Sequence, residues 1–186
     1  MKHIVQRFAL SQLLARFAQD RRGVSAVEFA MLLPLMITLY LGAVEVSQGI
    51  GIDRKVTLTT RTVADLASQV SSINNTDMTN ILNASSSVIV PYDTSKLQVT
   101  VSAVEVDSNG VAKIAWSDTL GGTKRAKGST VSLPTAINVP STTLIWSEVA
   151  YNYTPTIGYV ITGTLKLSDQ IWMRPRLSET VTRVNS

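Results

Sequence analysis

The sequence predicts an α+β fold in which a long N-terminal helix packs on an antiparallel sheet of about four strands. A stretch without any charged residue runs from Phe29 to Val44. Apolar residues then recur at spacings of three and four to about Ser72, whereas from Leu97 onward apolar and polar residues alternate. Helical side chains share a face every three or four residues and strand side chains every two, so the chain changes from helix to sheet. Helix and strands that are separated along the chain are typical of the α+β class.

The helix is expected to begin at Val24 and to cross a membrane with its first part. The apolar region 24–52 exceeds the roughly 20 residues that a spanning helix needs. Pro34 lies inside this region, where a proline removes a backbone donor and usually kinks the helix. In residues 53–72 the pattern turns amphipathic, with an apolar stripe of Val56, Val63, Leu66, Ala67 and Val70. At about 1.5 Å per residue the helix is about 70 Å long, so this second half must leave a hydrocarbon core of roughly 30 Å.

The distribution of charge predicts the orientation of the span. Of 186 residues, 45% are hydrophobic and 16% are charged, and the net charge is +4. All of the excess positive charge lies in the basic leader, residues 1–23, while the rest of the chain is formally neutral. Positive residues next to a span stay in the cytoplasm, so the N-terminus is expected there and the C-terminal domain across the membrane. The basic balance is therefore a topology signal, and we expect no nucleic acid partner.

Residues 73–186 are predicted to form the C-terminal α+β domain. The stretch Ser71–Thr76 indicates a break, after which Asp77 is expected to cap a short helix that ends near Ala84, before a serine-rich turn. A strand follows at about 97–106, in which Val104 and Val106 are one position out of phase and predict a bulge.

The later strands are marked by turns and by alternation. Asn109-Gly110 predicts a hairpin, and Ala112, Ile114 and Trp116 then alternate with other residues. The Gly-, Ser-, Thr- and Pro-rich stretch 121–140 is expected to be a long loop, and further strands are expected at about 144–153 and 161–173.

The residue inventory argues against an enzyme. The chain has no cysteine, and its one histidine, His3, lies in the leader. Without them the rest of the chain cannot form a Ser-His-Asp triad, a Cys-His dyad or a typical zinc site. No two carboxylates stand out as a hydrolase pair. We expect no catalysis, no cofactor and no metal. The segment Gly121–Gly128 lacks the spacing of a P-loop and is expected to be a solvated basic loop.

The junction between the leader and the apolar run carries the strongest signal. It reads Arg-Arg-Gly-Val-Ser-Ala-Val-Glu-Phe from Arg21 to Phe29. A carboxylate inside a membrane helix costs roughly 2.5–3.5 kcal/mol and therefore implies a partner for Glu28. Cleavage after Gly23 would create one, because the new amino group of Val24 lies one helical turn away. A secretory signal peptide has its cleavage site after the apolar core, whereas this site comes before it.

This arrangement resembles the processing site of type IV-like prepilins, and in particular the TadE-like family of small pseudopilins from the tight-adherence (Tad) pilus system. The segment Gly23–Leu35 carries the resemblance, together with Leu41-Gly42-Ala43-Val44-Glu45. Weaker similarity lies in Tyr151-Asn152-Tyr153-Thr154-Pro155 and in Arg174-Pro175-Arg176. The resemblance implies a pilin-like fold, held in the inner membrane with its domain in the periplasm.

The same resemblance implies function and partners. The chain would be cut by a prepilin peptidase and would act as a minor pseudopilin in assembly of a Flp-type (type IVb) pilus for adherence and biofilm formation. Its partners would be other pilins or pseudopilins, the inner-membrane assembly machinery and the lipid bilayer. Entry into the extracellular fibre is left open.

The candidate site residues are Gly23 and Val24 for processing and Glu28, Phe29 and Glu45 for assembly. Glu28 is expected to neutralise an N-terminal amine, and the alternative is that it snorkels near the leader arginines. Snorkelling into periplasmic headgroups explains Glu45 adequately, and a pairing role in assembly is the alternative. Arg174 and Arg176 are expected either to form ion pairs with acidic residues of the helix or a partner, or to be an exposed strand end.

Two other functions share much of this sequence pattern. The first is an uncleaved single-pass membrane protein whose domain binds or scaffolds envelope proteins. The second is a secreted adhesin-like module released by signal peptidase, although 43–51 holds no convincing cleavage site. The N-terminal sequence of the purified protein would separate all three.

Overall fold

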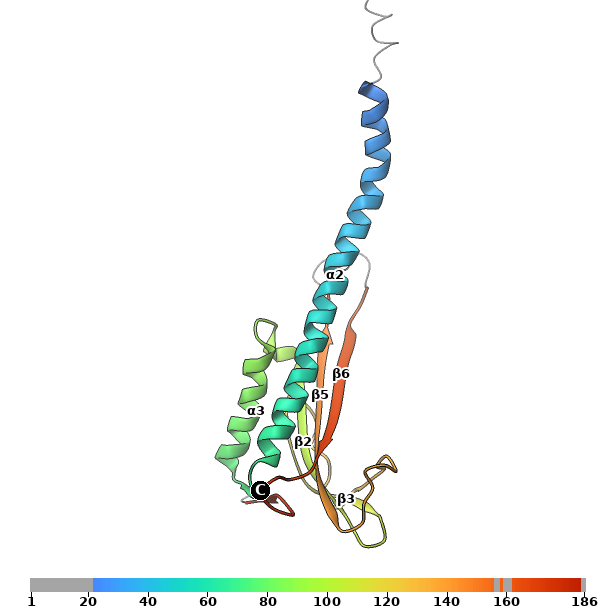
Figure 1. Cartoon of the computed structure of the whole chain (residues 1–186). Coiled ribbons are helices and arrows are strands. Elements are labelled where there is room, and N and C mark those ends of the chain that lie inside the picture. The colour runs from blue at the N-terminus through green and yellow to red at the C-terminus, as the bar shows by residue number, and fades with distance from the viewer. Residues whose placement is uncertain (1–21, 156–157, 159–161, 185–186) are drawn as a thin grey trace, which may run out of the picture. The chain divides into compact units, whose positions relative to one another are not determined.

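The computed structural model describes residues 22–155, 158 and 162–184, so the leader before Arg22 lies outside the described part (Figure 1). The chain divides into two compact units at the boundary between Val44 and Glu45. Helix α2, Arg22–Ser68, is continuous across this boundary. The predicted long helix is thus confirmed, and it ends four residues before the expected Ser72.

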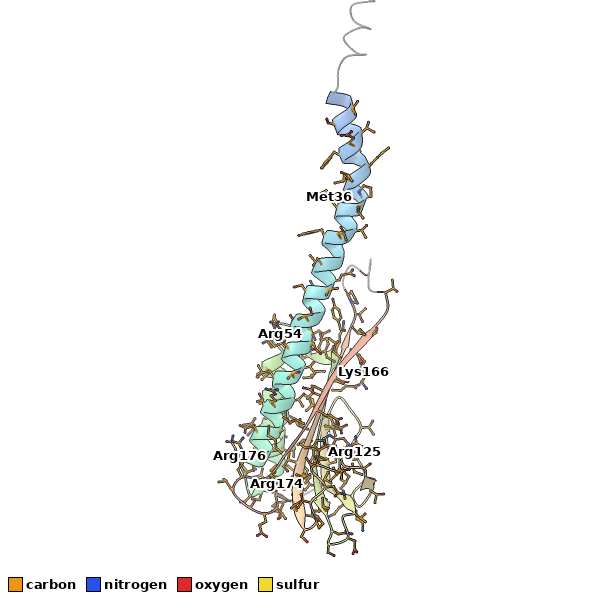
Figure 2. All side chains as sticks on the ribbon, turned by 45° about the vertical axis from the view of Figure 1, so that its right-hand side comes forward. Met36, Arg54, Arg125, Lys166, Arg174 and Arg176 are labelled. Atoms are coloured by element: carbon orange, nitrogen blue, oxygen red, sulfur yellow. The ribbon has the colours of Figure 1, made fainter. Side chains whose placement is uncertain are left out.

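In the first unit, the described residues form an apolar stretch of α2 with its side chains in the open. Phe29, Met31 and Leu39 are 57%, 76% and 65% exposed, and Met36 projects freely from the ribbon (Figure 2). Pro34 lies inside the helix without ending it. Among the described residues this is one helix long and apolar enough to cross a membrane, with a mean hydropathy of 1.9.

The second unit, from Glu45 onward, is built on an antiparallel sheet of five strands. Their order across the sheet is β4 (Thr130–Val131), β3 (Ala112–Leu120), β2 (Leu97–Val106), β5 (Thr142–Tyr153) and β6 (Leu165–Met173). Helix α3, Asn75–Ile89, and a short 3-10 turn, Thr94–Lys96, precede β2. The predicted α+β class is confirmed. The extra strand is β4, a two-residue edge strand inside the stretch predicted to be loop.

The main core lies between the helices and one face of the sheet. Helix α2 contributes Val56, Val63 and Ala67, all fully buried, with Leu66 and Val70 packed beside them. These are the residues of the predicted apolar stripe. The sheet contributes the buried side chains of Leu97, Val99, Val101 and Ala103 from β2 and of Ile145, Val149, Tyr151 and Tyr153 from β5. Burying one such aliphatic side chain stabilises the fold by about 1.5–3 kcal/mol, so this face holds the unit together.

A second apolar cluster explains the phase change in β2, and it corrects the predicted bulge. Val104 and Val106 pack with Ile114 and Trp146 in a cluster separate from the main core. Strand β2 keeps unbroken register with β5, so its even-numbered residues simply face the other side of the sheet. The register shift is against β3, where Ala103 pairs with Trp116 and Val104 with Ile114, which leaves Ala115 as the extra residue. The bulge is present, but it lies on β3.

Helix α3 differs from the prediction at both ends. Its N-cap is Asn74, whose side chain accepts from the backbone of Asp77 while the Asp77 carboxylate accepts from the backbone of Asn74. This reciprocal capping box places the start three residues before the expected cap. The helix runs on to Ile89, so the expected serine-rich turn is helical, and the buried Ser85 within it donates to the carbonyl of Leu82.

The predicted hairpin after β2 is confirmed. Its loop spans residues 107–111, between β2 and β3. The Asp107 carboxylate accepts from the backbone amides of Asn109 and Val111, and Gly110 has a φ of 80°. Glycine adopts that left-handed conformation without strain, which is why the Asn-Gly pair predicts the turn.

A C-terminal segment after β6 fastens the ends of the helices to the sheet. Strand β7, Thr182–Arg183, pairs in parallel with β1, Ser72–Ile73. The amide of Arg176 donates to the carbonyl of Ser68 at 2.8 Å, which satisfies an acceptor left open at the end of α2. Trp116 donates from Nε1 to the carbonyl of Val181 at 2.7 Å.

Candidate functional site

The predicted processing and assembly residues lie in the first turns of α2. Gly23 and Val24 are helical, and among residues 22–155, 158 and 162–184 nothing outside the adjacent helix backbone lies within 4 Å of a side-chain carbon built at Gly23. Glu28 is exposed and follows Val24 by four residues, or about 6 Å along the helix axis at 1.5 Å per residue. A free amino group at Val24 and the Glu28 carboxylate would therefore stand on the same face, one turn apart. Phe29, 57% exposed, is next to Glu28.

Glu45 is placed differently from Glu28 and Phe29, the other two predicted assembly residues. It is the first residue of the second unit and is only 1% exposed. A snorkelling carboxylate has its head in the solvent or headgroups, whereas this side chain is enclosed by the folded domain. Glu45 therefore lies inside the domain of the second unit, whereas Glu28 belongs to the first unit.

Tyr153 anchors the chain at Glu45. Its hydroxyl donates to the Glu45 carbonyl at 3.1 Å and lies 3.5 Å from Oε1 of Gln48. The ring also lies 3.6 Å from the position of a side-chain carbon on Gly49, so glycine allows the strand and helix to approach closely. Burial raises the pKa of the Tyr153 phenol, and the charge of Glu45 raises it further. The spacing Tyr151-x-Tyr153 marks this anchor in the sequence, because both rings face the helix from one strand.

The predicted ion pairing of the Arg-Pro-Arg element is confirmed for Arg176, whose guanidinium contacts the carboxylate of Asp65 on α2. Both side chains remain well exposed, at 57% and 36%, so this pair holds the segment weakly. Arg174 is exposed.

Arg183 forms a stronger contact that sequence reasoning missed. Its Nε donates to Oδ2 of Asp118 at 2.8 Å, and the two side chains are 6% and 11% exposed. Its other nitrogens donate to the carbonyls of Ile73 and Val184 and to Oδ1 of Asn75. Burial alone would raise the pKa of Asp118, but hydrogen bonds from Arg183 and Lys124 outweigh it and hold that pKa below its ordinary value. No local pattern marks this cluster, because its members are distant in sequence.

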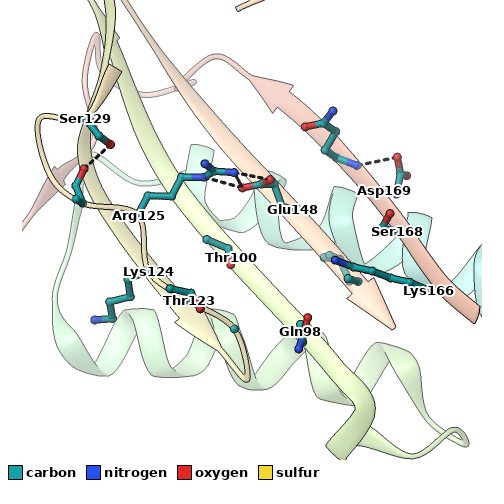
Figure 3. A pocket seen from close by; sticks show the side chains of 15 residues that line it. Gln98, Thr100, Thr123, Lys124, Arg125, Ser129, Glu148, Lys166, Ser168 and Asp169 are labelled. Atoms are coloured by element: carbon teal, nitrogen blue, oxygen red, sulfur yellow. Dashed lines mark hydrogen bonds and ion pairs between the residues drawn. The ribbon is translucent and has the colours of Figure 1, made fainter. Parts of the chain in front are cut away.

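An open groove of about 940 Å³ lies on the sheet face opposite the helices (Figure 3). Its wall is the basic loop 121–128, and its floor and far side come from β2, β5 and β6. Arg125 reaches across and donates from Nε and Nη2 to the Glu148 carboxylate at 2.8–2.9 Å. The same guanidinium lies 3.9 Å from the ring centre of Trp146, which stacks on Trp172 at 4.3 Å.

These contacts correct the expectation of a solvated basic loop. Arg125 is held by a bidentate pair and an aromatic face, an arrangement that arginine forms better than lysine. Lys124 is tied to Asp118 at 2.9 Å, and only Lys127 of the three cations extends freely from the described loop. Arg125 of the loop therefore covers Trp146 of the second apolar cluster, and the groove presents mainly hydrogen-bonding groups such as Gln98 and Ser168.

Comparison with known proteins bears on the N-terminal part of the chain. No curated protein and no solved structure matches the chain. The family model described as TadE-like protein matches residues 23–65, which confirms the resemblance that the Gly23–Leu35 motif predicts.

Proposed function

We propose that this protein is a minor pseudopilin that takes part in assembly of a Tad/Flp-type (type IVb) pilus. The observation that carries the proposal is the TadE-like match over residues 23–65, a segment that lies within α2. It is supported by an architecture in which one apolar helix continues into an antiparallel sheet domain. Adherence and biofilm formation are the cellular outcomes that such a pilus serves.

Processing is proposed to occur between Gly23 and Val24 by a prepilin peptidase. Within the described part of the chain, no atom outside the adjacent helix backbone lies within 4 Å of a side-chain carbon built at Gly23, which supports access by an enzyme. Intact-mass measurement of the protein purified from its native host should show loss of residues 1–23. A bulky substitution, Gly23→Trp, should leave the leader attached. A full-length wild-type protein would favour the uncleaved scaffold, and one that starts after Val44 would favour the secreted module.

The protein is proposed to reside in the inner membrane as a single-pass protein, with its N-terminus cytoplasmic and its domain periplasmic. Clustering of the excess positive charge before the span supports this orientation. A reporter fused after Ser186 that is active only in the periplasm should be active. Activity of a strictly cytoplasmic reporter at the same place would contradict the orientation.

Glu28 is proposed to pair with a cleaved N-terminus, of its own chain or of a neighbouring subunit. In low dielectric, an unpaired charge left by removing one partner costs several kcal/mol. Phe29 and the exposed apolar residues beside it would then pack against neighbouring helices, including those of other pilins or pseudopilins. Glu45 would contribute to assembly from inside the domain, at the junction that Tyr153 fastens.

The test of this role is Glu28→Gln, which keeps shape and removes the charge. The matched control is Glu179→Gln, an exposed carboxylate outside the helix. Only Glu28→Gln should reduce the number of surface pili, while immunoblots show processed monomer accumulating in the membrane. Normal pilus numbers in that strain would contradict the pairing role. We propose no catalytic role for the chain and no cofactor.

A further inference from the structure

Strand β6 forms one edge of the sheet and is paired on one side only. It keeps register with β5 from Leu165 to Met173 without a shift. Within residues 22–155, 158 and 162–184, no backbone hydrogen bond joins β6 to any segment other than β5. The backbone groups on its other side are therefore a template for one more strand. The strand has nine residues and contains no proline, so a partner strand could pair along its whole length.

The opposite edge of the sheet, along β3, is covered. The short strand β4 pairs with the start of β3. Ile114 donates to the carbonyl of Ser129 and accepts from the amide of Gly128. Further along β3, the amide of Arg125 donates to Oγ of Ser117 at 3.2 Å. Proteins commonly protect their sheet edges against association, so the long edge that stays open is the one suited to pairing with a partner.

Asp169 is the central residue of the open edge strand. It is opposite Val149 in the register and therefore belongs to the face of the sheet that carries the main core. Its Oδ1 accepts from the backbone amide of Gln170 at 2.8 Å, beside the edge of β6 that faces away from β5 (Figure 3). Asp169 is not among the described ion pairs. The middle of the edge thus carries a negative charge without a described cation.

A second copy of the chain fits this edge poorly. In a symmetric antiparallel pair of two β6 strands, full overlap places Asp169 opposite Asp169 of the other copy, with Cβ atoms about 4.5–5.5 Å apart. Like charges directly opposite each other are destabilising. Pairing centred on Ser168 leaves the two carboxylates as diagonal neighbours, about 7–8 Å apart. Pairing centred on Gln170 places Lys166 opposite Arg174. The charges of the strand therefore disfavour self-pairing in all three registers.

We propose that the open edge of β6 is a strand-addition site for an extended segment of another protein, one that carries a lysine or arginine opposite Asp169. Opposite charges on directly facing residues stabilise a strand pair, and the carbonyls of the incoming strand can replace Asp169 as acceptors. The half-buried Leu167 and Ile171 flank Asp169 on the same face, so the partner has apolar residues two positions to either side of its cation. The site uses only residues of the second unit and is independent of the proposed pilus role.

The experiment measures peptide binding to the full chain in detergent micelles by fluorescence anisotropy. The probe is the labelled peptide Val-Thr-Val-Thr-Lys-Thr-Val-Thr-Val, which reads the same in both directions and so presents its lysine to Asp169 in either orientation. The control peptide has glutamate in place of that lysine. Both are titrated against the wild type, Asp169→Lys and the matched variant Glu179→Lys, which reverses an exposed charge outside the sheet. Circular dichroism verifies that each variant is folded.

The wild type and Glu179→Lys should bind the lysine peptide about 5- to 30-fold more tightly than the glutamate peptide. Asp169→Lys should reverse that preference. Absence of binding by both peptides to the wild type would overturn the strand-addition site. Equal binding of both peptides to the wild type would overturn the role of Asp169 in choosing the partner, as would a preference that survives Asp169→Lys.

Self-pairing is tested separately with nitroxide labels, because the chain has no cysteine of its own. Labels are placed at Ser168→Cys on the open edge and at Lys113→Cys, an exposed position on β3. In any of the three self-paired registers the labels at 168 come within about 15 Å of each other, at 3.4 Å per residue, and broaden the spectrum. Spectra without excess broadening at 168 over 113 support a different protein as the partner. Broadening confined to 168 would show that a second copy occupies the edge and would overturn the proposal.

Discussion

Replacing Asp118 by Asn tests whether the ion pair between Arg183 and Asp118 holds the C-terminal segment on the domain. The pair is nearly dry, with side chains 11% and 6% exposed and 2.8 Å between Oδ2 and Nε. Asn keeps the shape of the side chain and removes its charge. The natural control is Asp65→Asn, because Asp65 pairs with Arg176 of the same segment but at an exposed site, where the side chains are 36% and 57% accessible.

The expected loss of stability depends on the hydrogen bonds that Arg183 retains in the variant. Removing one partner of a buried ion pair typically costs about 3–5 kcal/mol. Arg183 retains the carbonyls of Ile73 and Val184 and the amide oxygen of Asn75, so the lower end, about 3 kcal/mol, applies. An exposed pair contributes about 0–1 kcal/mol, which is the expected loss for Asp65→Asn. At about 2–4 °C per kcal/mol for a chain of this size, Asp118→Asn should lower Tm by about 6–12 °C.

Thermal unfolding followed by circular dichroism, with the full chain in nanodiscs, measures both losses. Hydrogen exchange shows whether the segment detaches, since the amides of Thr182 and Val184 donate to the carbonyls of Ser71 and Ile73. Both amides should lose protection in Asp118→Asn before the sheet does. Equal and small losses in the two variants, with protection unchanged, would refute the assignment of the lock to Arg183.

Three further predictions concern pH, a glycine and the tyrosine anchor. Folding lowers the pKa of Asp118, so its carboxylate contributes fully to the free energy of unfolding above the ordinary pKa of 3.8. This contribution is lost as the pH falls through the pKa of the folded state. The loss of stability with acid should therefore be smaller for Asp118→Asn than for the wild type. Gly121→Ala should cost about 1–2 kcal/mol for its φ of 67°, plus about 1–3 kcal/mol because the new carbon would lie 2.7 Å from the carbonyl oxygen of Leu97. Gly128→Ala, with a φ of 80° and open space, should show only the first cost, and equal Tm losses would contradict the clash. Tyr153→Phe should lower the free energy of unfolding by about 1 kcal/mol through loss of its hydrogen bond to α2, and an unchanged denaturant midpoint would contradict that anchor.

Features with a local cause could be predicted from the sequence. The long helix follows from one apolar run and one stripe, and the hairpin follows from Asn109-Gly110 with alternating residues on both sides. The sequence predicts a bulge in β2 because Val104 and Val106 are out of phase with the preceding apolar residues. Such a change of phase has two explanations. Either the strand is bulged, or both faces of the sheet are covered. The second applies here, since Val131, Leu133 and Trp172 pack against the cluster that holds Val104 and Val106 on the outer face. Only the paired register identifies Ala115 as the extra residue.

Features made by contacts between distant residues could not be predicted. Strands β1 and β7 have two residues each, too short for any periodic signal, and they pair across more than 100 residues of sequence, where Arg183 also donates to the carbonyl of Ile73. The burial of Glu45 depends on the domain that folds around it. Its position at the end of an apolar run predicts only a side chain that reaches the lipid headgroups. Gly23, Val24 and Glu28 stand out in the sequence because the role proposed for them is local, within the first turns of one helix.

The connection between the helix ends and the C-terminal segment has a consequence for folding during synthesis. Thr182 reaches back 111 residues to Ser71, and Arg183 reaches back 110 to Ile73. At 5–20 residues per second, the end of α2 and the start of α3 exist for about 5–20 s before their partners are made. Throughout that interval their backbone acceptors and the pocket for Arg183 are open. The sheet can pair strand by strand as it appears, but the helical layer can be fastened only after β6. Degradation therefore competes with a single late closing step, and variants of Arg176 or Arg183 should alter the yield of the protein more than the structure of its sheet.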